Sequence, residues 1–219
     1  MTDYPSPNHG ERRGGVLPSL IVLHYTAMPT CAEARVRLCD PAAEVSAHWL
    51  ISEAGEAEAL VPEDRRAWHA GAGGWGGITD VNSHSIGVEL ANPGDRPFPE
   101  PQMAALETLL AAIMHRWSIP PERLIAHSDL APTRKRDPGA RFDWRRLALG
   151  GMAVWPQDAN KADPAGFLSN LRLFGYPEAV PELLLTAFRL RFRPWAKGPL
   201  DAMDSGLAAN LARCWPAAG

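Results

Sequence analysis

Short apolar runs of strand length recur along the first two thirds of the chain, separated by polar or glycine-containing segments. Continuous apolar runs of ~4–8 residues are typical of strands buried on both faces. The clearest runs are Leu20–Leu23, which is followed by His24, and Leu124–Ala126, which is followed by His127. We expect strands at residues 20–24, 47–52, 57–61, 86–91 and 124–127.

A helical pattern lies between the last two of these strands. Pro101 opens a segment in which apolar side chains recur at steps of three and four residues, as on one face of a helix. These positions are Met103, Leu106, Leu110, Ile113, Met114 and Trp117. Weaker helical patterns cover residues 31–38 and 143–149. This mixture of strands and helices between residues 20 and 149 predicts one α/β domain, with the long helix covering its sheet.

The composition changes after Trp155-Pro156. Residues 157–164 are polar and resemble a linker, and residues 165–219 contain three short helical patterns that predict a small three-helix domain. The apolar positions of the three patterns are Phe167, Leu168, Leu171 and Phe174, then Val180, Leu183, Leu184, Ala187, Phe188 and Phe192, and finally Met203, Leu207, Leu211 and Trp215. A module of about fifty residues is near the lower limit for independent folding, which makes packing against the first domain an expected source of its stability.

The charge and hydropathy of the chain exclude some classes of partner. The formal net charge is -3 and the isoelectric point is near 6.2, so we expect neither nucleic acid nor an anionic membrane as a partner. The first fifteen residues contain no apolar core of a signal peptide, and no uninterrupted apolar stretch reaches the ~18 residues that span a bilayer. These features predict a soluble cytoplasmic protein, which we expect to be a monomer.

The cysteines give no sign of a disulfide framework. Cys31, Cys39 and Cys214 are odd in number and form no CxxC pair, which fits reduced thiols. A bridge between Cys31 and Cys39 stays an open alternative.

Two histidines and an aspartate form a candidate metal site. His24 and His127 follow buried strands, and Asp137 lies ten residues after His127 in an Asp-Pro-Gly sequence. Imidazole and carboxylate groups suit zinc, and three protein ligands leave a fourth position open for water, as in catalytic sites. Taken singly, each residue has an ordinary interpretation, since such histidines are often hydrogen-bonded core residues and Asp-Pro-Gly is usually a turn.

A second pair of residues strengthens the catalytic interpretation. Glu89 lies inside the apolar run 85–90, where a carboxylate must be paired, face a cleft or be destabilising. Beside a metal-bound water it could act as the general base. Lys135, two residues before Asp137, could stabilise an oxyanion, although the run 134–136 also reads as a solvated basic segment.

Several spaced motifs occur in an order that is known from one enzyme family. They are Leu23-His24-Tyr25-Thr26, Ser46-Ala47-His48-Trp49-Leu50, Ala67-Trp68-His69-Ala70-Gly71, the stretch from Asn82 to Asn92, and the stretch from His127 to Gly139. Across about residues 18–156 the chain resembles the zinc-dependent N-acetylmuramoyl-L-alanine amidases of the peptidoglycan recognition protein and phage lysozyme type, and within them the AmiD/AmpD-type enzymes. The resemblance implies a mixed central β-sheet flanked by helices in residues 1–156.

The resemblance also implies roles for individual residues. His24, His127 and Asp137 stand at the positions of the ligands for one Zn²⁺ ion per chain. Glu89 stands at the position of the catalytic acid/base, and Lys135 at that of the oxyanion-stabilising residue.

Further motif positions line the substrate groove in such enzymes. Here they are Trp68, His69 and Asn92, although Trp68 fits a core role equally well. We interpret His48 as structural, with a role behind the metal ligands as the alternative. The glycine-rich run 71–77 cannot be regular structure, because ordering so many glycines is entropically costly, and we expect a loop near the site.

The resemblance implies hydrolysis of the amide bond between N-acetylmuramic acid, or its 1,6-anhydro form, and the L-alanine of a stem peptide. The expected partners are muropeptides or peptidoglycan fragments from wall turnover. Residues 165–219 resemble the helical peptidoglycan-binding domain of some family members, and the alternative is a packing element that shapes the groove. The rival functions are a binding-only peptidoglycan recognition protein, a zinc hydrolase acting on another bond, and a structural metal site.

Overall fold

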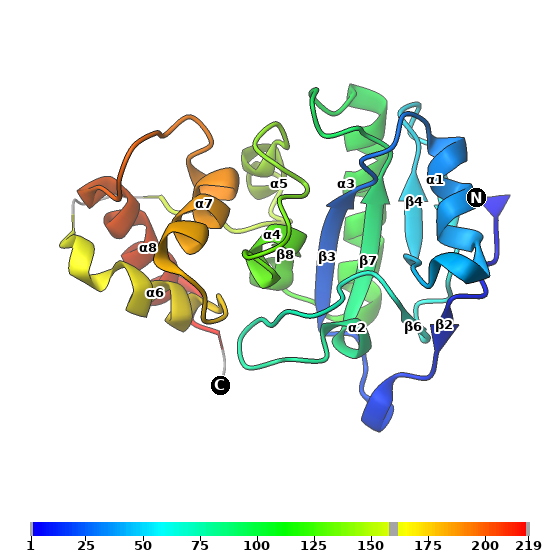
Figure 1. Cartoon of the computed structure of the whole chain (residues 1–219), viewed down its shortest axis with the longest axis horizontal. Coiled ribbons are helices and arrows are strands. Elements are labelled where there is room, and N and C mark those ends of the chain that lie inside the picture. The colour runs from blue at the N-terminus through cyan, green and yellow to red at the C-terminus, as the bar shows by residue number, and fades with distance from the viewer. Residues whose placement is uncertain (1, 158–161, 218–219) are drawn as a thin grey trace.

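The protein, described by a computed structural model over residues 2–157 and 162–217, has a sheet at its centre and helices around it (Figure 1). The predicted linker 157–164 falls partly on residues 158–161, which lie outside the described part of the chain. The main sheet has six strands in the order β1-β5-β4-β7-β3-β8, and β2 pairs separately with β6. The strands are β1 Thr2–Asp3, β2 His9–Gly10, β3 Leu20–Tyr25, β4 Trp49–Ile51, β5 Ala57–Ala59, β6 Arg66–Ala67, β7 Ser85–Leu90 and β8 Leu124–Ala126.

The sheet is mixed, which confirms the expected fold class. β3 pairs in parallel with both β7 and β8, β4 pairs in parallel with β7, and β5 runs antiparallel to β4. The α-helices are α1 Cys31–Cys39, α2 Val81–His84, α3 Glu100–Trp117, α4 His127–Leu130, α5 Trp144–Leu149, α6 Phe167–Phe174, α7 Pro181–Phe192 and α8 Ala202–Cys214. Short 3₁₀ turns cover Arg13–Gly15, Pro41–Ala43, Pro121–Arg123 and Pro164–Gly166.

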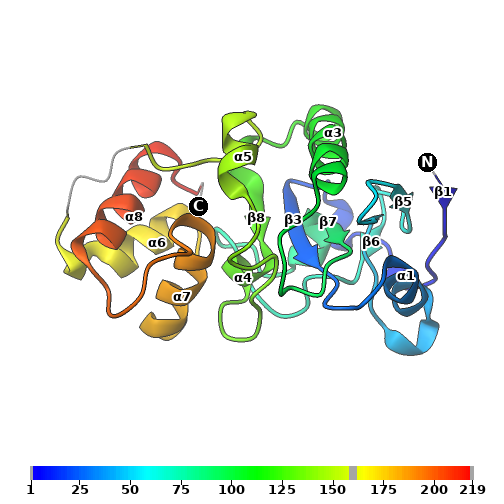
Figure 2. The same ribbon diagram turned by 90° about the horizontal axis from the view of Figure 1, so that it is seen from above.

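The first four residues of β3, Leu20–Leu23, are all apolar because both faces of the strand are covered. Ile21 and Leu23 point to the face that packs against Leu106 and Leu110 of α3. Figure 2 shows α3 and α5 on this side of the strands, with α1 and α4 on the other. Alternate residues of a strand point to opposite faces, so Leu20, Val22 and His24 share the face away from α3. The pattern of β3 therefore places the candidate ligand His24 on the side that the long helix leaves open.

The predicted strands and helices are present, with shifted ends. The predicted strand 47–52 is shorter in the structure, and the strand expected to reach His127 ends at Ala126. His127 is instead the first residue of the short helix α4, because Asp129 accepts a hydrogen bond from the backbone N–H of Ala126 and caps the turn. The elements β1, β2, β6 and α2 had no recognisable pattern, since two to four residues are too few for a period.

The three predicted C-terminal helices are present as α6, α7 and α8, and they pack against the first domain. Leu20 and Val22 of β3 and Ile125 of β8 belong to the same buried apolar cluster as Phe174 and Phe192. The sheet face away from α3 therefore shares its core with the helical module.

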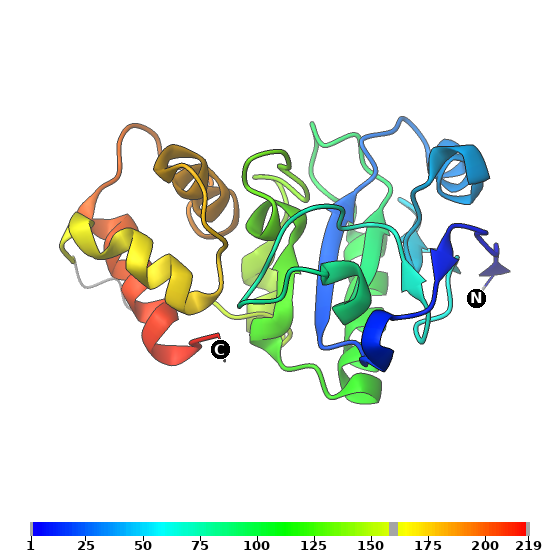
Figure 3. The ribbon, with the colours of Figure 1, turned by 60° about the horizontal axis from the view of Figure 1, so that its bottom comes forward.

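The glycine-rich run 71–77 is irregular, as expected, and also joins the two parts of the molecule. Trp75 is buried, and its ring lies 5.4 Å from that of Phe174 between centroids. Gly175, at φ +131°, lies so close that a Cβ there would be 2.7 Å from Cε2 of Trp75. Figure 3 shows this loop extending from α2 towards the C-terminal helices. Trp75 in this loop thus packs against the C-terminal module, while the start of the loop lies near the candidate site.

The structure bears on two expectations from the sequence, the absence of a membrane-spanning helix and the state of the cysteines. None of the helices in the described residues has both the length and the apolar character that crossing a bilayer requires. All three cysteines lie in the described ranges and are free thiols, so Cys31 and Cys39 are not bridged.

Candidate metal centre and active site

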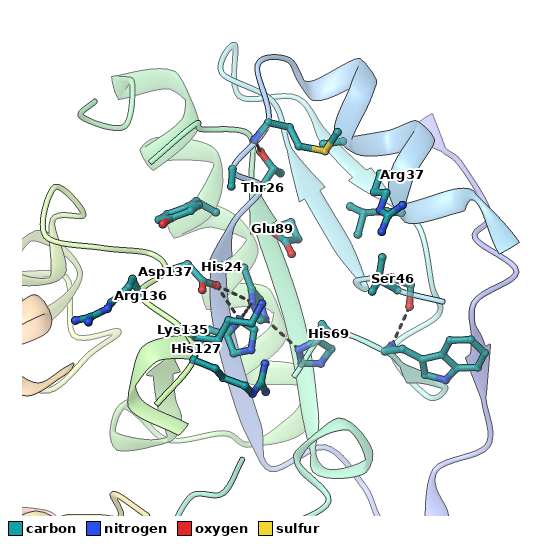
Figure 4. Close-up of a pocket in the computed structure, with 18 residues that line it drawn as sticks. His24, Thr26, Arg37, Ser46, His69, Glu89, His127, Lys135, Arg136 and Asp137 are labelled. Carbon is teal, nitrogen blue, oxygen red and sulfur yellow. Dashed lines mark hydrogen bonds and ion pairs between the residues drawn. The ribbon is translucent and has the colours of Figure 1, made fainter. Parts of the chain in front are cut away.

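The structure brings His24, His127 and Asp137 together beside the sheet (Figure 4). His24 lies near the end of β3, His127 begins α4, and Asp137 ends the loop that follows α4. Nδ1 of His24 is 2.9 Å from Nδ1 of His127 and 3.1 Å from Oδ2 of Asp137, and the third side of this triangle is 2.9 Å. All three side chains are buried. The sequence prediction that these residues meet is confirmed.

The hydrogen bond made by Nε2 of each histidine shows which ring nitrogen carries the hydrogen, while Nδ1 faces the triangle. Nε2 of His127 lies 3.0 Å from the carbonyl oxygen of Ala70, so it must carry the hydrogen and donate. Nε2 of His24 lies 3.1 Å from Nδ1 of His69, and Nε2 of His69 lies 3.2 Å from Oγ of Ser85. The Ser85 hydroxyl donates to the carbonyl of Val81, so its oxygen accepts from His69. His69 Nδ1 is therefore the acceptor, and His24 donates to it from Nε2.

In the neutral form of both rings, this hydrogen-bonding chain leaves a lone pair on Nδ1 of His24 and of His127. Burial, and next the proximity of His127, lowers the pKa of His24 to about 4, so its ring is neutral at neutral pH. Two lone pairs and a carboxylate oxygen within about 3 Å repel one another unless a cation lies between them. The donor set, two imidazole nitrogens and one carboxylate oxygen, fits a divalent transition metal, and outer hydrogen bonds of this kind orient such ligands.

Glu89 lies beside this triangle on the same face of the sheet. It pairs with His24 in the register of β7 with β3. Its Oε2 atom is buried and has no hydrogen-bond partner among the described residues. Burial, and next the negative charge of Asp137, raises the pKa of Glu89 to about 8, although Lys135 opposes the shift. A carboxylate with such a pKa and a free oxygen can accept and return a proton near neutral pH.

A basic segment forms one side of the pocket. The loop between α4 and Asp137 carries Arg134, Lys135 and Arg136, all of which line the pocket of about 390 Å³ that contains the triangle. Arg134 donates from Nε to the carbonyl of Ala72 at 2.8 Å and thereby fastens the beginning of the glycine-rich loop to the site. Lys135 is half-buried, and Figure 4 shows it beside His127. The loop therefore places positive charge next to the candidate metal ligands.

The three residues expected to line the substrate groove occupy different environments. Trp68 is half-buried and lines the pocket. His69 also borders it, but its ring is buried and both of its nitrogens are used in the hydrogen bonds described above. Asn92 does not line this pocket: it is 2% exposed, and its side chain binds the backbone of Gly94 and Arg96 in the loop after β7. Trp68 thus lies in the wall of the pocket, whereas His69 and Asn92 have buried positions from which they shape the site without an exposed side chain.

His48 is a structural residue in this arrangement. Its Nδ1 accepts from the backbone N–H of Gly87 at 2.9 Å, and its Nε2 lies 3.1 Å from the carbonyl of Arg65. Burial lowers its pKa to about 3, so the ring is neutral.

The sequence interpretation missed two residues that hold the ligands in place. Ser85 ends the hydrogen-bonding chain from His24. Gly87 provides the space for the ring of His69, because a Cβ there would lie 2.4 Å from Cγ of His69. A glycine inside a buried strand often marks such a close approach, so Gly87 carried a usable signal, whereas a serine at a strand start carries none.

The comparisons with known proteins agree with this geometry. The family described as N-acetylmuramoyl-L-alanine amidase matches residues 14–140. The chain is 35% identical to N-acetylmuramoyl-L-alanine amidase AmiD of Escherichia coli over 88% of this chain and 81% of that protein. It is 33% identical to 1,6-anhydro-N-acetylmuramyl-L-alanine amidase AmpD of Enterobacter cloacae over 65% of this chain and 86% of that protein.

Two solved structures resemble this chain over more than nine tenths of its length. The complex of E. coli AmiD with anhydro-N-acetylmuramic acid-L-Ala-D-γ-Glu-L-Lys has a TM-score of 0.84 at 32% identity, and covers 96% of this chain and 99% of that one. AmpDh3 of Pseudomonas aeruginosa in complex with anhydromuramic pentapeptide has a TM-score of 0.82 at 30% identity, and covers 94% of this chain and 95% of that one. The similarity therefore includes the C-terminal helices.

Proposed function

Because this chain belongs to the N-acetylmuramoyl-L-alanine amidase family, we propose that His24, His127 and Asp137 bind one zinc ion and that hydrolysis takes place beside it. Hydrolase activity follows from the family membership. The metal's identity and the role of each residue are our proposal. The observation that carries it is the convergence of one imidazole nitrogen from each of two histidines and one carboxylate oxygen within about 3 Å, with Glu89 alongside.

The residues of the chain divide the remaining chemistry between them. A bound zinc ion would supply Lewis-acid chemistry, which polarises a carbonyl and lowers the pKa of water. Glu89 takes a proton from the attacking water and delivers it to the nitrogen of the leaving amine, and a pKa near 8 suits both steps. The ammonium group of Lys135 stabilises the negative charge that develops on the carbonyl oxygen.

The proposed substrate is a soluble muropeptide, cleaved between the muramic acid and the L-alanine of its stem peptide. Two relatives that match this chain over more than nine tenths of its length have been solved with anhydromuramic peptides bound. Trp68, which is half-buried and lines the pocket, would form one wall of the groove that receives the substrate.

A binding-only function is the alternative that the sequence left open. A recognition protein has no need for the complete set of ligands, whereas all three converge here with a proton acceptor beside them. The geometry therefore favours hydrolysis.

The proposed roles can be tested with one variant and two controls. We expect Glu89→Ala to abolish turnover of a muramyl tripeptide while zinc content stays near one per chain. His127→Ala should lose both zinc and turnover, and Glu56→Ala, at an exposed acid outside the pocket, should lose neither. A Glu89→Ala variant that is nearly as active as the wild type would contradict the acid/base role.

The cytoplasmic location and the monomeric state stay predictions. Fractionation of cells that express the natural gene would test the first, and recovery outside the cytoplasm would contradict it. Light scattering after gel filtration would test the second, since a monomer has a mass of 23.8 kDa.

A further inference from the structure

A buried aspartate joins the C-terminal helices to the segment that carries His127. Asp129, two residues after His127 in α4, is 0% exposed. Its Oδ2 accepts a hydrogen bond from the backbone N–H of Ala126, which caps α4, and another from Nη1 of Arg191 at 2.7 Å. Its Oδ1 accepts from the hydroxyl of Tyr176 at 2.6 Å. One carboxylate therefore receives hydrogen bonds both from Ala126, the residue that precedes its own helix, and from the C-terminal module.

Arg191 of α7 holds both ends of the β8–α4 segment. Besides Asp129, it donates from Nη2 to the carbonyl of Leu124, the first residue of β8, at 3.0 Å. Arg191 as a residue is 1% exposed, and its guanidinium lies 4.3 Å from the ring centroid of Trp144. A planar guanidinium with fixed donor directions binds two acceptors only when they lie at a set spacing. Arg191 thus sets the position of the residues on either side of His127.

Asp137 and Lys135 are also attached to α4 by backbone hydrogen bonds. The backbone N–H of Ser128 donates to the carbonyl of Asp137 at 3.0 Å, and that of Lys135 donates to the carbonyl of Ala131 at the end of α4. A shift of α4 would therefore move His127, Asp137 and Lys135 together.

We propose that the C-terminal module is a positioning part of the metal centre, in which Arg191 and Tyr176 act through Asp129 to place His127. This inference rests on the proposed function, because it takes His127 as a metal ligand. Neither Arg191 nor Tyr176 lines the pocket, so neither is a catalytic residue. A module that only tethered the enzyme to its substrate would not need a buried ion pair to this helix. Buried ion pairs are costly to desolvate and often add little stability, whereas they can fix one arrangement of the chain.

The same helix offers a matched control. Arg189 of α7 also forms a buried ion pair, with Asp204 of α8, but that pair lies within the C-terminal module. Asp204 keeps a second partner, Arg193, when Arg189 is removed. Arg189→Met and Arg191→Met therefore make the same chemical change on one helix, and only the second breaks a contact with α4.

The test measures zinc affinity by competition with a chromogenic chelator, together with kcat and KM on a muramyl tripeptide. Residues behind metal ligands typically change metal affinity or activity by about 10- to 100-fold, so we expect Arg191→Met to weaken zinc binding at least tenfold and to lower kcat. Arg189→Met should stay within about threefold of the wild type in zinc affinity, even if its melting temperature falls. Equal zinc affinity in the two variants would overturn the proposal.

Two milder variants keep the test decisive if Arg191→Met does not fold. Tyr176→Phe removes one hydrogen bond to Asp129, and Arg191→Lys keeps the charge but loses the two-pronged contact with Leu124 and Asp129. Both should weaken zinc binding by severalfold and lower kcat more than they change KM. Wild-type zinc affinity in both would overturn the proposal. Absence of zinc binding by the wild type itself would overturn the proposed function and, with it, this inference.

Discussion

Replacing Glu89 by glutamine should raise the free energy of unfolding of the metal-free protein at alkaline pH. The same substitution should remove the activity of the zinc-loaded protein. The pKa of Glu89 is raised from 4.5 to about 8 by burial and by the charge of Asp137. Below pH 4.5 the carboxyl is protonated in both the folded and the unfolded chain, so its ionisation does not change the free energy of unfolding. As the pH rises towards 8, the unfolded chain ionises first, so the folded state loses stability relative to it. Glutamine cannot ionise and is spared this loss.

The size of the stability difference follows from the shift in the pKa of Glu89. A rise from 4.5 to about 8 corresponds to a difference of about 5 kcal/mol in how the folded protein stabilises the protonated and the ionised carboxyl. Solvent that reaches the pocket screens part of the electrostatic interaction, so we expect about 2–3 kcal/mol in practice. The advantage of Glu89→Gln over the wild type should therefore be near zero at pH 4.5 and reach about 2–3 kcal/mol between pH 8 and 9. A bound cation would reduce it, because positive charge favours the carboxylate.

Urea unfolding of both proteins at a series of pH values, with chelator present, measures this difference directly. The histidines titrate in both proteins and cancel in the comparison, so the remaining pH dependence belongs to position 89. Unfolding free energies that differ by a constant amount from pH 4.5 to 9 would contradict the raised pKa of Glu89, whose half-buried carboxyl has an Oε2 atom without a partner among the described residues.

Three further changes test other parts of the site and the core. Gly87→Ala should weaken zinc binding about tenfold in a chelator competition, because its Cβ would push the His69 ring away from the ligand that it orients; unchanged affinity would argue against that support. Lys135→Met should lower kcat about 100-fold with little change in KM, and a loss confined to KM would instead make this residue a binding group. Ending the chain after residue 156 should give an aggregated product, because Val22 and Ile125 lose the helices that cover them; a soluble monomer with native circular dichroism would contradict the shared core.

The strand and helix patterns were sufficient to predict the sheet and its principal helix. Leu20–Leu23 is apolar at every position because it is covered on both faces, and that pattern is readable without a structure. The meeting of His24, His127 and Asp137 was also predictable, since a strand end and a following loop bring polar groups to one side of a sheet. The environment of Asn92 was not, because a motif position does not show whether a side chain turns towards the groove or back towards its own loop.

The link between the C-terminal helices and α4 could not be found in the sequence. Arg191 lies among apolar helical positions and reads as a solvated residue of an amphipathic helix. Its partner Asp129 is 62 residues away in the chain. A buried ion pair between such distant residues has no local pattern, because it depends on how the module is oriented against the sheet.

Zinc-dependent cleavage before the L-alanine of a muropeptide can be followed in one reaction with two substrates. The zinc-loaded protein is incubated with equal amounts of a muramyl peptide and its 1,6-anhydro counterpart, and both are followed by mass spectrometry. We predict release of stem peptide that begins at L-alanine, abolished by chelation and restored by zinc, with the ratio of the two substrates consumed giving the preference. Intact substrates in the presence of a protein that carries one zinc per chain would contradict this cleavage and favour the binding-only function.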